Sequence, residues 1–318
     1  MLDWTRERFA KMPAAVKGAV LMTIAAGAFA GMNVTIRAMN GELHPFQVAF
    51  LRCAVGFLFM LPWLAHAGFA GLKTGSQKLY GSRAFVGYAS MLCWFTALAY
   101  LPVAEATALS FTSPLFATAA AALLLGEIVR RRRWTATIVG FLGAMIVLRP
   151  GLDGVSLAHA LVLASAALGG WNAITVKQLT RTDNPNTIIL YMTIYLVPLS
   201  LVPALFVWQW PSAQGWLLTL VLGAFATIGH QSFTRALAQC EASYVLPFDF
   251  TRLPIVAVMA YFIFGEVPDI WTWVGGSVIV GATVYIARRE AQLARLANLA
   301  SAHSLHANEV AAVAKRQP

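Results

Sequence analysis

The sequence carries little charge for its length. Of its 318 residues, 11% are charged, whereas 59% are hydrophobic and the mean hydropathy is +0.68. A soluble protein of this size keeps most of its surface in water and cannot bury so large an apolar fraction. The scarcity of charge therefore excludes an ordinary soluble protein and predicts an integral membrane protein.

Cysteine and histidine are also scarce, and neither is arranged as a ligand set. The cysteines Cys53, Cys93 and Cys240 lie in or beside apolar stretches without paired spacing, which excludes a disulfide framework and a zinc site. The six histidines include no pair at i,i+4 spacing. The sequence contains no HExxH, GxSxG or P-loop motif, so it predicts no enzyme, no metal, no cofactor and no direct use of ATP.

Alternating segments of about 10 residues, which a membrane β-barrel would need, are absent as well. The apolar runs instead have the roughly 20 residues that a membrane-spanning helix requires. The predicted fold is an all-α integral membrane protein with ten transmembrane helices and no long hydrophilic insert. The predicted helices are 18–38, 46–66, 79–100, 103–125, 134–149, 155–180, 186–208, 214–239, 243–265 and 270–288.

Basic residues alternate along the chain between these helices. They gather before the first helix, around Lys73 and Lys78, in the run Arg130–Arg133, and after residue 287. Because cytoplasmic segments of membrane proteins collect Lys and Arg, both termini are predicted to be cytoplasmic. The net charge of +10 then indicates membrane topology rather than a nucleic-acid partner.

The sequence repeats itself at an offset of 139 residues. The register matches Gly31 and Asn33 with Gly170 and Asn172, Phe111-Thr112 with Phe250-Thr251, Gly126-Glu127 with Gly265-Glu266, and Trp134 with Trp273. Each copy holds five helices, an odd number, so the second copy enters the membrane inverted, as in secondary transporters. The repeat also favours a retained first helix over a cleaved signal peptide at Ala28-Phe29-Ala30.

The repeat sets the predicted domain boundaries. A cytoplasmic N-terminal segment of residues 1–17 precedes the first five-helix repeat, 18–149. The second repeat, 150–288, is followed by a cytoplasmic tail, 289–318. In such proteins the substrate binds near mid-membrane, where helices of the two repeats are interrupted in corresponding places.

The fourth and ninth helices carry such interruptions. Pro114 lies in one, next to Thr112, and Pro247 and Pro254 lie in the other. Proline frees a backbone carbonyl that a cavity can use, although a simple packing kink is the alternative. Thr112 is therefore a candidate substrate-binding residue.

Charged residues inside the helices are further candidates, because burying them in a membrane is costly. Asp249 and Arg252 are three residues apart on one helix face and could contact substrate or form a structural ion pair. Arg52 could face a cavity or extend to the membrane surface. His230 could bind substrate or make a packing hydrogen bond.

Polar and aromatic residues complete the candidate list. Asn33 and Asn172 occupy equivalent repeat positions, where they could line a cavity or join helices. Candidate cavity aromatics are Tyr88, Trp94 and Trp171.

Two stretches carry a resemblance to a known family: "ALAYLPVAEATALSFTSPLFATAAAALLLGE" and its echo "ALAQCEASYVLPFDFTRLPIVAVMAYFIFGE". With the ten-helix pattern over residues 18–288, they resemble the EamA-type carriers of the drug/metabolite transporter superfamily. The resemblance implies a central cavity lined by the first, third, fourth, sixth, eighth and ninth helices. It also implies alternating access, in which one repeat rocks against the other.

The predicted function is secondary active transport of a small organic metabolite across the bacterial inner membrane. The cationic candidates favour an amino-acid-like substrate, or another that carries a carboxylate or phosphate. The alternatives are a channel or lipid scramblase of the same fold and, much less favoured, an intramembrane enzyme. The predicted partners are the substrate and membrane lipid, without nucleic acid, and the protein is predicted to be a monomer or homodimer.

Overall fold

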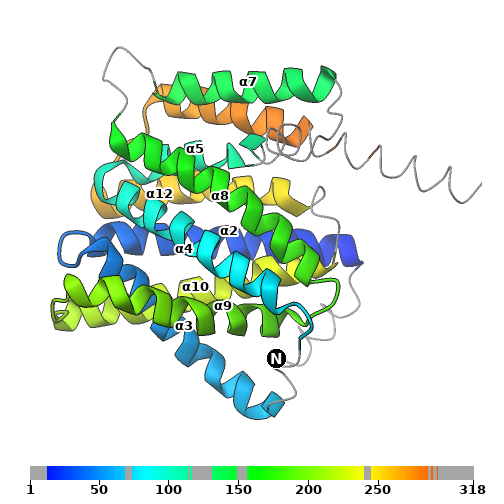
Figure 1. Ribbon diagram of the computed structural model, residues 1–318. Coiled ribbons are helices and arrows are strands. Elements are labelled where there is room, and N and C mark those ends of the chain that lie inside the picture. Colours follow the sequence, from blue (N-terminus) through cyan, green and yellow to red (C-terminus); the bar gives the residue numbers. More distant parts are fainter. Residues whose placement is uncertain are drawn as a thin grey trace, which may run out of the picture.

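The computed structural model describes residues 13–68, 74–113, 115–116, 131–148, 156–239 and 245–285, with Arg288 and Gln292. Every regular element within these ranges is helical (Figure 1). The predictions for residues 1–12, Pro114, Glu127 and most of the tail lie outside the described residues. So do those for Arg130 and for the side chains of Arg131–Arg133.

The helices coincide with the predicted apolar segments to within about four residues wherever the chain is described, except for the predicted helix 103–125, which is interrupted after Ser110. They are α2 (Ala14–Met39), α3 (Pro45–Ala67), α4 (Gln77–Tyr100), α5 (Val103–Ser110), α7 (Arg131–Leu148), α8 (Leu157–Leu179), α9 (Pro185–Phe206), α10 (Ala213–Gln239), the 3-10 helix η2 (Leu246–Thr251), α12 (Arg252–Phe264) and a last helix, Ile270–Tyr285. Within the described ranges, six helical segments are long and apolar enough to cross a membrane. They lie in α2, α3, α8, α9, α10 and η2–α12. The count of ten transmembrane helices stays a prediction.

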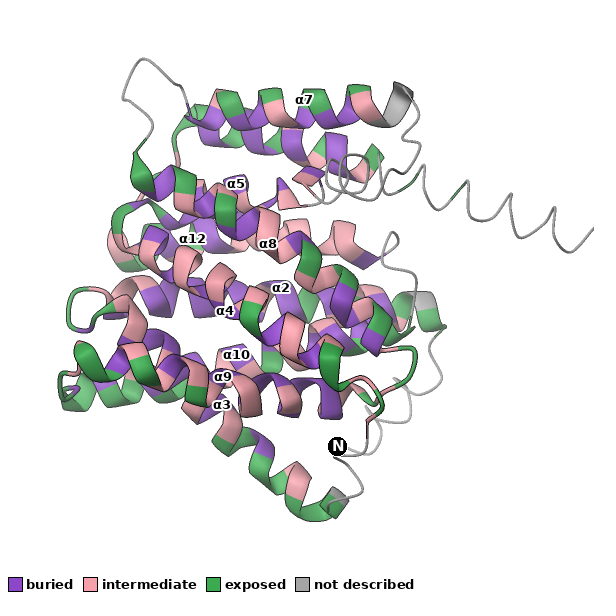
Figure 2. Cartoon of the chain, viewed as in Figure 1, coloured by how far each residue is buried: buried purple, intermediate pink, exposed green. Residues whose placement is uncertain are grey.

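Exposed residues lie on the outer sides of the helices (Figure 2), and many of them are large and apolar. Phe85, Tyr100, Phe206, Trp210 and Phe262 each expose more than 70% of their surface. A soluble monomer rarely presents so much apolar surface, whereas a lipid-facing surface requires it. The molecule is an integral membrane protein.

Helices pack in pairs that follow the sequence repeat. α2 packs most extensively on α10, and α4 packs in the same way on α8. The first helix of each predicted repeat therefore lies against the third helix of the other, and the second helices α3 and α9 lie against each other. This reciprocal packing is the arrangement that two inverted repeats would produce.

The second helix of each repeat also begins in the same way. At α3 the side chain of His44 accepts a hydrogen bond from the Phe46 amide, 3.3 Å away, and Pro45 is the first helical residue. At α9 Asn184 accepts from the Asn186 amide at 2.9 Å, and Pro185 occupies the first position. A polar cap followed by proline fixes a helix start, because proline lacks the amide that would be unpaired there.

The fourth helix of each repeat is interrupted at the predicted Phe-Thr pair. α5 ends at Ser110 and the chain turns at Phe111 and Thr112, while η2 ends at Thr251 and α12 begins at Arg252. The rings of Phe111 and Phe250, equivalent in the repeat, pack edge to face with centroids 4.8 Å apart. The two interruptions therefore meet at the centre of the molecule.

Polar contacts between the repeats join the helix ends on one side of the bundle, which we call the Glu266 face. Glu266 accepts a hydrogen bond from the Val103 amide at 3.1 Å and lies 3.4 Å from the Arg37 guanidinium. Glu266 follows Gly265, whose φ of 69° ends α12 in the left-handed conformation. The carboxylate thus joins α12 to α2 and α5 rather than only forming a polar helix end.

A second set of contacts joins the opposite ends of the helices, which we call the Asp183 face. Asp183 accepts hydrogen bonds from the hydroxyls of Thr74 at 2.6 Å and Tyr80 at 2.7 Å. Gln77, in the same segment, bonds to the hydroxyls of Tyr191 and Tyr195. These contacts also connect the first half of the chain to the second.

Candidate functional site

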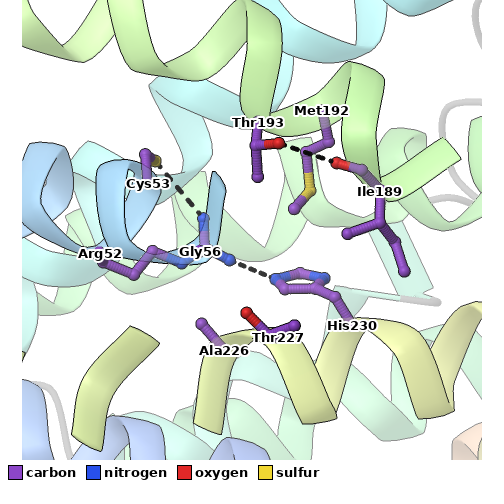
Figure 3. A pocket seen from close by; sticks show the side chains of 9 residues that line it. All are labelled: Arg52, Cys53, Gly56, Ile189, Met192, Thr193, Ala226, Thr227 and His230. Atoms are coloured by element: carbon purple, nitrogen blue, oxygen red, sulfur yellow. Dashed lines mark hydrogen bonds between the residues drawn. The ribbon is translucent and has the colours of Figure 1, made fainter. Parts of the chain in front are cut away.

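Arg52, in the second turn of α3, points into the interior of the bundle and is only 5% exposed. Its guanidinium Nη2 lies within hydrogen-bonding distance of Nε2 of His230 on α10 (Figure 3). Since arginine can only donate, the imidazole accepts this bond through an unprotonated Nε2. Arg52 therefore lies in the interior of the bundle and does not extend to the membrane surface.

A small cavity adjoins this pair. It has an empty volume of about 220 Å³. Its walls come from α3, α9 and α10, and its lining residues are Arg52, Cys53, Gly56, Ile189, Met192, Thr193, Ala226, Thr227 and His230 (Figure 3). Part of this space is open to the surroundings, and the enclosed part holds little more than a water molecule, so binding of a metabolite requires these helices to separate.

Arg83 is a second buried guanidinium near this cavity. It lies on α4, is 7% exposed, and its Nη2 is 3.5 Å from the sulfur of Met192 in the cavity wall. Met192 thus lies between Arg83 and the cavity that Arg52 and His230 line. We refer to Arg52, Arg83 and His230 as the Arg52 cluster.

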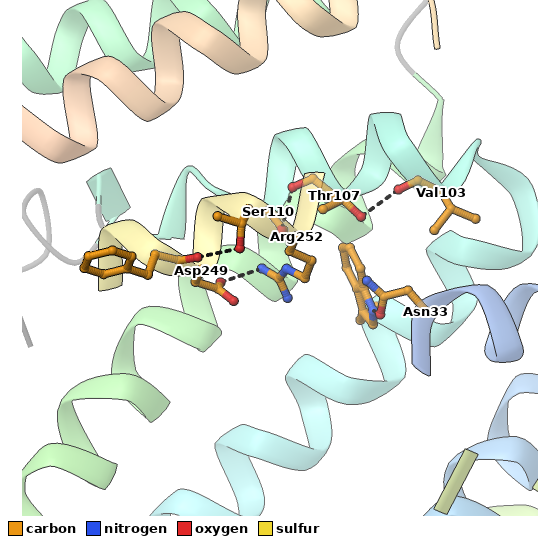
Figure 4. A network of polar contacts seen from close by, with 9 residues as sticks. Asn33, Val103, Thr107, Ser110, Asp249 and Arg252 are labelled. Carbon is orange, nitrogen blue, oxygen red and sulfur yellow. Dashed lines mark hydrogen bonds and ion pairs between the residues drawn. The ribbon is translucent and has the colours of Figure 1, made fainter. Parts of the chain in front are cut away.

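Asp249 and Arg252 form an ion pair on the interrupted ninth helix. Oδ2 of Asp249 lies 3.0 Å from Nη2 of Arg252, and the two side chains face α5 near Ser110 (Figure 4). The Arg252 guanidinium lies 5.3 Å from the ring centroid of Phe111 and 5.9 Å from that of Phe29. Both distances are within cation–π range. The predicted pairing at i,i+3 is thus present.

Phe29 of α2 connects these two groups of charged residues. Its ring packs edge to face on His230, with centroids 5.1 Å apart, while the same ring contacts Arg252. Asn33 lies one helical turn further along α2 and accepts a hydrogen bond from the indole of Trp94 at 3.2 Å. We refer to Phe29, Trp94 and Phe111, which contact these polar side chains, as the aromatic wall.

Several buried polar atoms of the candidate residues and of Arg83 have no hydrogen-bond partner within the described part of the chain. They are Nδ2 of Asn33, the Tyr88 hydroxyl, Oδ1 of Asn172, Oδ1 of Asp249 and the Nε atoms of Arg52, Arg83 and Arg252. Buried polar groups normally have partners, because leaving one unpaired costs about 1–3 kcal/mol. These atoms are therefore the ones that a bound polar molecule would satisfy.

Two of the sequence candidates lie apart from this arrangement. The hydroxyl of Thr112 is fully buried and donates to the Leu109 carbonyl at 2.7 Å, so its hydrogen is used within the chain turn. Trp171 on α8 is 47% exposed. The remaining candidates, Asn33, Arg52, Tyr88, Trp94, Asn172, His230, Asp249 and Arg252, are buried or half-buried.

The sequence analysis missed Arg83 and Phe29 as site residues. Arg83 follows the basic residues Lys73 and Lys78, which suggests a connecting segment, yet it lies within α4 and is buried. Because Arg83 lies inside the predicted helix 79–100, the sequence could have identified it as a charged residue within the membrane. Phe29 precedes Asn33 by one helical turn, so the two share a face.

Comparison with known proteins gives one family across both halves of the chain. The EamA-like transporter family matches residues 16–149 and 156–288. The chain is 34% identical over 285 residues to a riboflavin transporter of Vibrio cholerae, covering 88% of this chain and 96% of that protein. A riboflavin transporter of Rhizobium johnstonii is 34% identical over 294 residues, covering 91% and 97%. An S-adenosylmethionine uptake transporter of Rickettsia prowazekii is 29% identical over 254 residues, covering 80% and 86%.

Proposed function

The chain belongs to the EamA-like transporter family, and on this premise we propose that it is a secondary carrier of the bacterial inner membrane. It moves a small organic metabolite by alternating access of its two repeats, residues 18–149 and 150–288. Both termini face the cytoplasm, as the distribution of basic residues favours. The reciprocal packing of α2 on α10 and α4 on α8 supports ten helices in two inverted repeats.

Riboflavin, or a similar planar heterocycle, is the substrate we propose. Two relatives that align over nearly their whole length are named riboflavin transporters. The flavin ring is flat and aromatic and carries carbonyl and imide groups along one edge. Such a ring suits a site where aromatic rings stand beside unpaired amide and hydroxyl groups.

This substrate differs from the amino-acid-like molecule that the sequence favours, since riboflavin carries neither a carboxylate nor a phosphate. S-adenosylmethionine, named for another relative, is amino-acid-like and is the second candidate. Arg52 favours it, because a buried guanidinium matches a carboxylate.

The observation that carries the proposal is a set of buried, unpaired polar atoms, of which the amide of Asn33 adjoins the aromatic wall. The amide nitrogen of Asn33 and the hydroxyl of Tyr88 are buried without partners, and Phe29 and Trp94 lie near Asn33. Stacking of a substrate ring on these aromatics would place its polar edge against the unpaired groups. The absence of a clustered nucleophile or metal-ligand motif in the sequence leaves no support for an intramembrane enzyme.

Uptake of riboflavin by purified protein in liposomes tests the proposal. We expect uptake of labelled riboflavin to saturate and to be inhibited by unlabelled riboflavin. Liposomes without protein should show no such uptake. Uptake that rises linearly without competition would identify a channel instead. Strong competition by S-adenosylmethionine with no riboflavin uptake would favour the second substrate.

Two tryptophans supply a matched pair of variants for this assay. Trp94→Ala removes the indole that bonds to Asn33 and should raise the half-saturating concentration about 3- to 10-fold. Trp171→Ala removes an indole that is 47% exposed and should change it less than twofold. Equal effects of the two substitutions would contradict the proposed position of the substrate.

A further inference from the structure

The two arginines of the Arg52 cluster are buried without an acidic partner. Arg52 and Arg83 are 5% and 7% exposed, and neither forms an ion pair with any described carboxylate. A guanidinium is positively charged under all ordinary conditions. The interior of the protein therefore holds two positive charges that nothing in the described chain neutralises.

The chain supplies a counter-charge elsewhere in the same interior. Arg252, with a side chain 17% exposed, has the carboxylate of Asp249 at 3.0 Å. That pair forms a locally neutral group beside Phe111. Arg52 and Arg83 lack any equivalent, although they are more deeply buried.

The partners that these arginines do have are weak acceptors. Arg52 contacts the sulfurs of Cys53 at 3.7 Å and Met91 at 3.6 Å, besides His230. Arg83 contacts the sulfur of Met192 at 3.5 Å. Thiols and thioethers accept hydrogen bonds poorly, and the Nε atoms of both arginines have no partner. Several strong donors are thus left for a ligand.

These donors lie beside the cavity inside the bundle. Arg52 lines the central cavity, and Arg83 reaches its wall at Met192. Because both guanidinium groups are positively charged and face the same small region, they repel each other. An anion between them would relieve this repulsion and also satisfy the unpaired donors.

We propose that Arg52 and Arg83 together bind an oxyanion group, a phosphate or carboxylate, where the cavity between α3, α9 and α10 adjoins Arg83 of α4. This inference rests on the proposed carrier function and adds a cationic subsite beside the aromatic wall. The group belongs either to the transported molecule or to a free inorganic anion that occupies the site with a neutral substrate. Planar guanidinium groups suit both, since they bind carboxylate and phosphate with paired hydrogen bonds.

Equilibrium binding to the purified full chain in detergent tests the proposal. The probes are riboflavin, riboflavin 5′-phosphate, S-adenosylmethionine and inorganic phosphate, each titrated by calorimetry. Riboflavin and riboflavin 5′-phosphate share the flavin ring, and only the second carries a phosphate. The ratio of their affinities therefore measures the contribution of the anionic group. The third presents a carboxylate, and the fourth is a free anion.

The variants Arg52→Gln and Arg83→Gln each remove one charge while keeping a polar side chain. We expect each to weaken binding of an anionic probe, relative to riboflavin, by about 10- to 100-fold, the effect of one hydrogen bond to a charged group. Arg83→Lys keeps the charge and should retain part of the affinity. Arg181→Gln removes an exposed charge between α8 and α9 and should leave the ratio unchanged.

The outcomes separate the two sources of the anion. A selective loss of riboflavin 5′-phosphate or S-adenosylmethionine binding assigns the oxyanion to the transported molecule. Inorganic phosphate that binds the wild type and not the Gln variants assigns it to a free anion. If no anionic probe binds the wild type, or if the Gln variants bind all probes equally well, the proposal is overturned.

Two checks keep these outcomes apart from other failures. Size-exclusion profiles show whether each variant is folded, and Arg83→Lys replaces Arg83→Gln if the latter is not. Binding is measured without transport, so Arg83-dependent phosphate binding with no uptake into liposomes would contradict the carrier function alone. Uptake of riboflavin without any anion binding would contradict only the cationic subsite.

Discussion

Several charged residues are buried inside this protein. Of these, Asp249 and Arg252 form an ion pair of opposite charges. The side chains are 18% and 17% exposed and their charged atoms lie 3.0 Å apart. Removing one partner of a buried ion pair leaves an uncompensated charge, whereas replacing both with apolar residues is often nearly neutral. The pair can therefore be separated experimentally into a structural and a functional contribution.

Asp249→Asn should destabilise the folded protein by about 3–5 kcal/mol, because Arg252 loses its counter-charge. The double variant Asp249→Leu with Arg252→Met should recover most of that loss. Thermal unfolding in detergent measures both effects. If the pair contacts substrate, the recovered double variant should still lose at least about tenfold in riboflavin uptake. Stable protein with normal uptake would show that the pair is structural.

At this scale the sequence predicted pairs that are close along the chain and missed those that are not. Asp249 and Arg252 are three residues apart, so helical periodicity brings them together. Arg52 and His230 are 178 positions apart, and no local pattern relates them. The sequence therefore identified both as buried polar residues without predicting that they touch.

Helices in this protein approach each other through glycines, and α7 and the helix Ile270–Tyr285 bring their backbones together at one such crossing. A Cβ on Gly275 would lie 2.6 Å from the carbonyl oxygen of Gly143 and 3.0 Å from the Val147 amide nitrogen. Backbone atoms cannot move aside as a flexible side chain can. Small residues at such crossings are typical of membrane helices, whose association depends on close packing.

Gly275→Ala should therefore destabilise the protein by about 1–3 kcal/mol, the usual effect of overpacking a tight contact. Gly281→Ala is the matched control on the same helix, since nothing lies within 4 Å of a Cβ there. It should be neutral or stabilising by up to about 1 kcal/mol, because alanine favours helix more than glycine does. Thermal unfolding in detergent compares the two. Equal stability of both variants would contradict the close crossing.

Helix positions were largely predictable because apolar runs bounded by charge or Pro and Gly leave few alternatives. The interruption of the ninth helix was also predictable from Pro247 and Pro254. Its form was not, since the chain adopts a 3-10 helix over Leu246–Thr251 and resumes as α-helix at Arg252. That choice depends on tertiary packing, in particular on Phe250 against Phe111.

The whole molecule is closed at both ends by contacts between its two halves. Glu266 joins α12 to α2 and α5 on one face, and Asp183 joins the start of α9 to Thr74 and Tyr80 on the other. Between these faces lies the cavity of about 220 Å³. In alternating access only one face opens at a time. Contacts that hold the Glu266 face closed therefore favour opening of the Asp183 face, and the reverse.

The repeat register predicted some of this arrangement and not the rest. It relates Leu98, whose carbonyl accepts from Arg37, to Leu237, whose carbonyl accepts from Lys177. The hydroxyl of Thr74 donates to Asp183, and at nearly matching positions that of Ser212 donates to Glu42. The bond from Tyr80 to Asp183 is not matched among the described residues, because the hydroxyl of Thr219, which matches Tyr80, donates to the Gly215 carbonyl. Contacts that differ between the two faces break the symmetry, and a repeat in the sequence cannot predict them.

Substitutions at the two faces should therefore have opposite effects on access to the centre. Cys53 lines the cavity and is 1% exposed, so a membrane-impermeant thiol reagent reaches it only when one face opens. Glu266→Gln weakens the contacts of the Glu266 face, and Asp183→Asn weakens those of the Asp183 face. A loss of about 1 kcal/mol on one face raises the population open on that side about fivefold.

The measurement uses vesicles of both orientations and protein in which Cys93 and Cys240 are replaced by serine. Glu266→Gln should speed labelling of Cys53 about fivefold in the orientation that presents the Glu266 face to the reagent, and slow it in the other. Asp183→Asn should do the reverse, so each variant is the control for the other. Faster labelling from both sides by either variant would indicate general loosening rather than a balance between two closed faces. That result would contradict alternating access through these contacts.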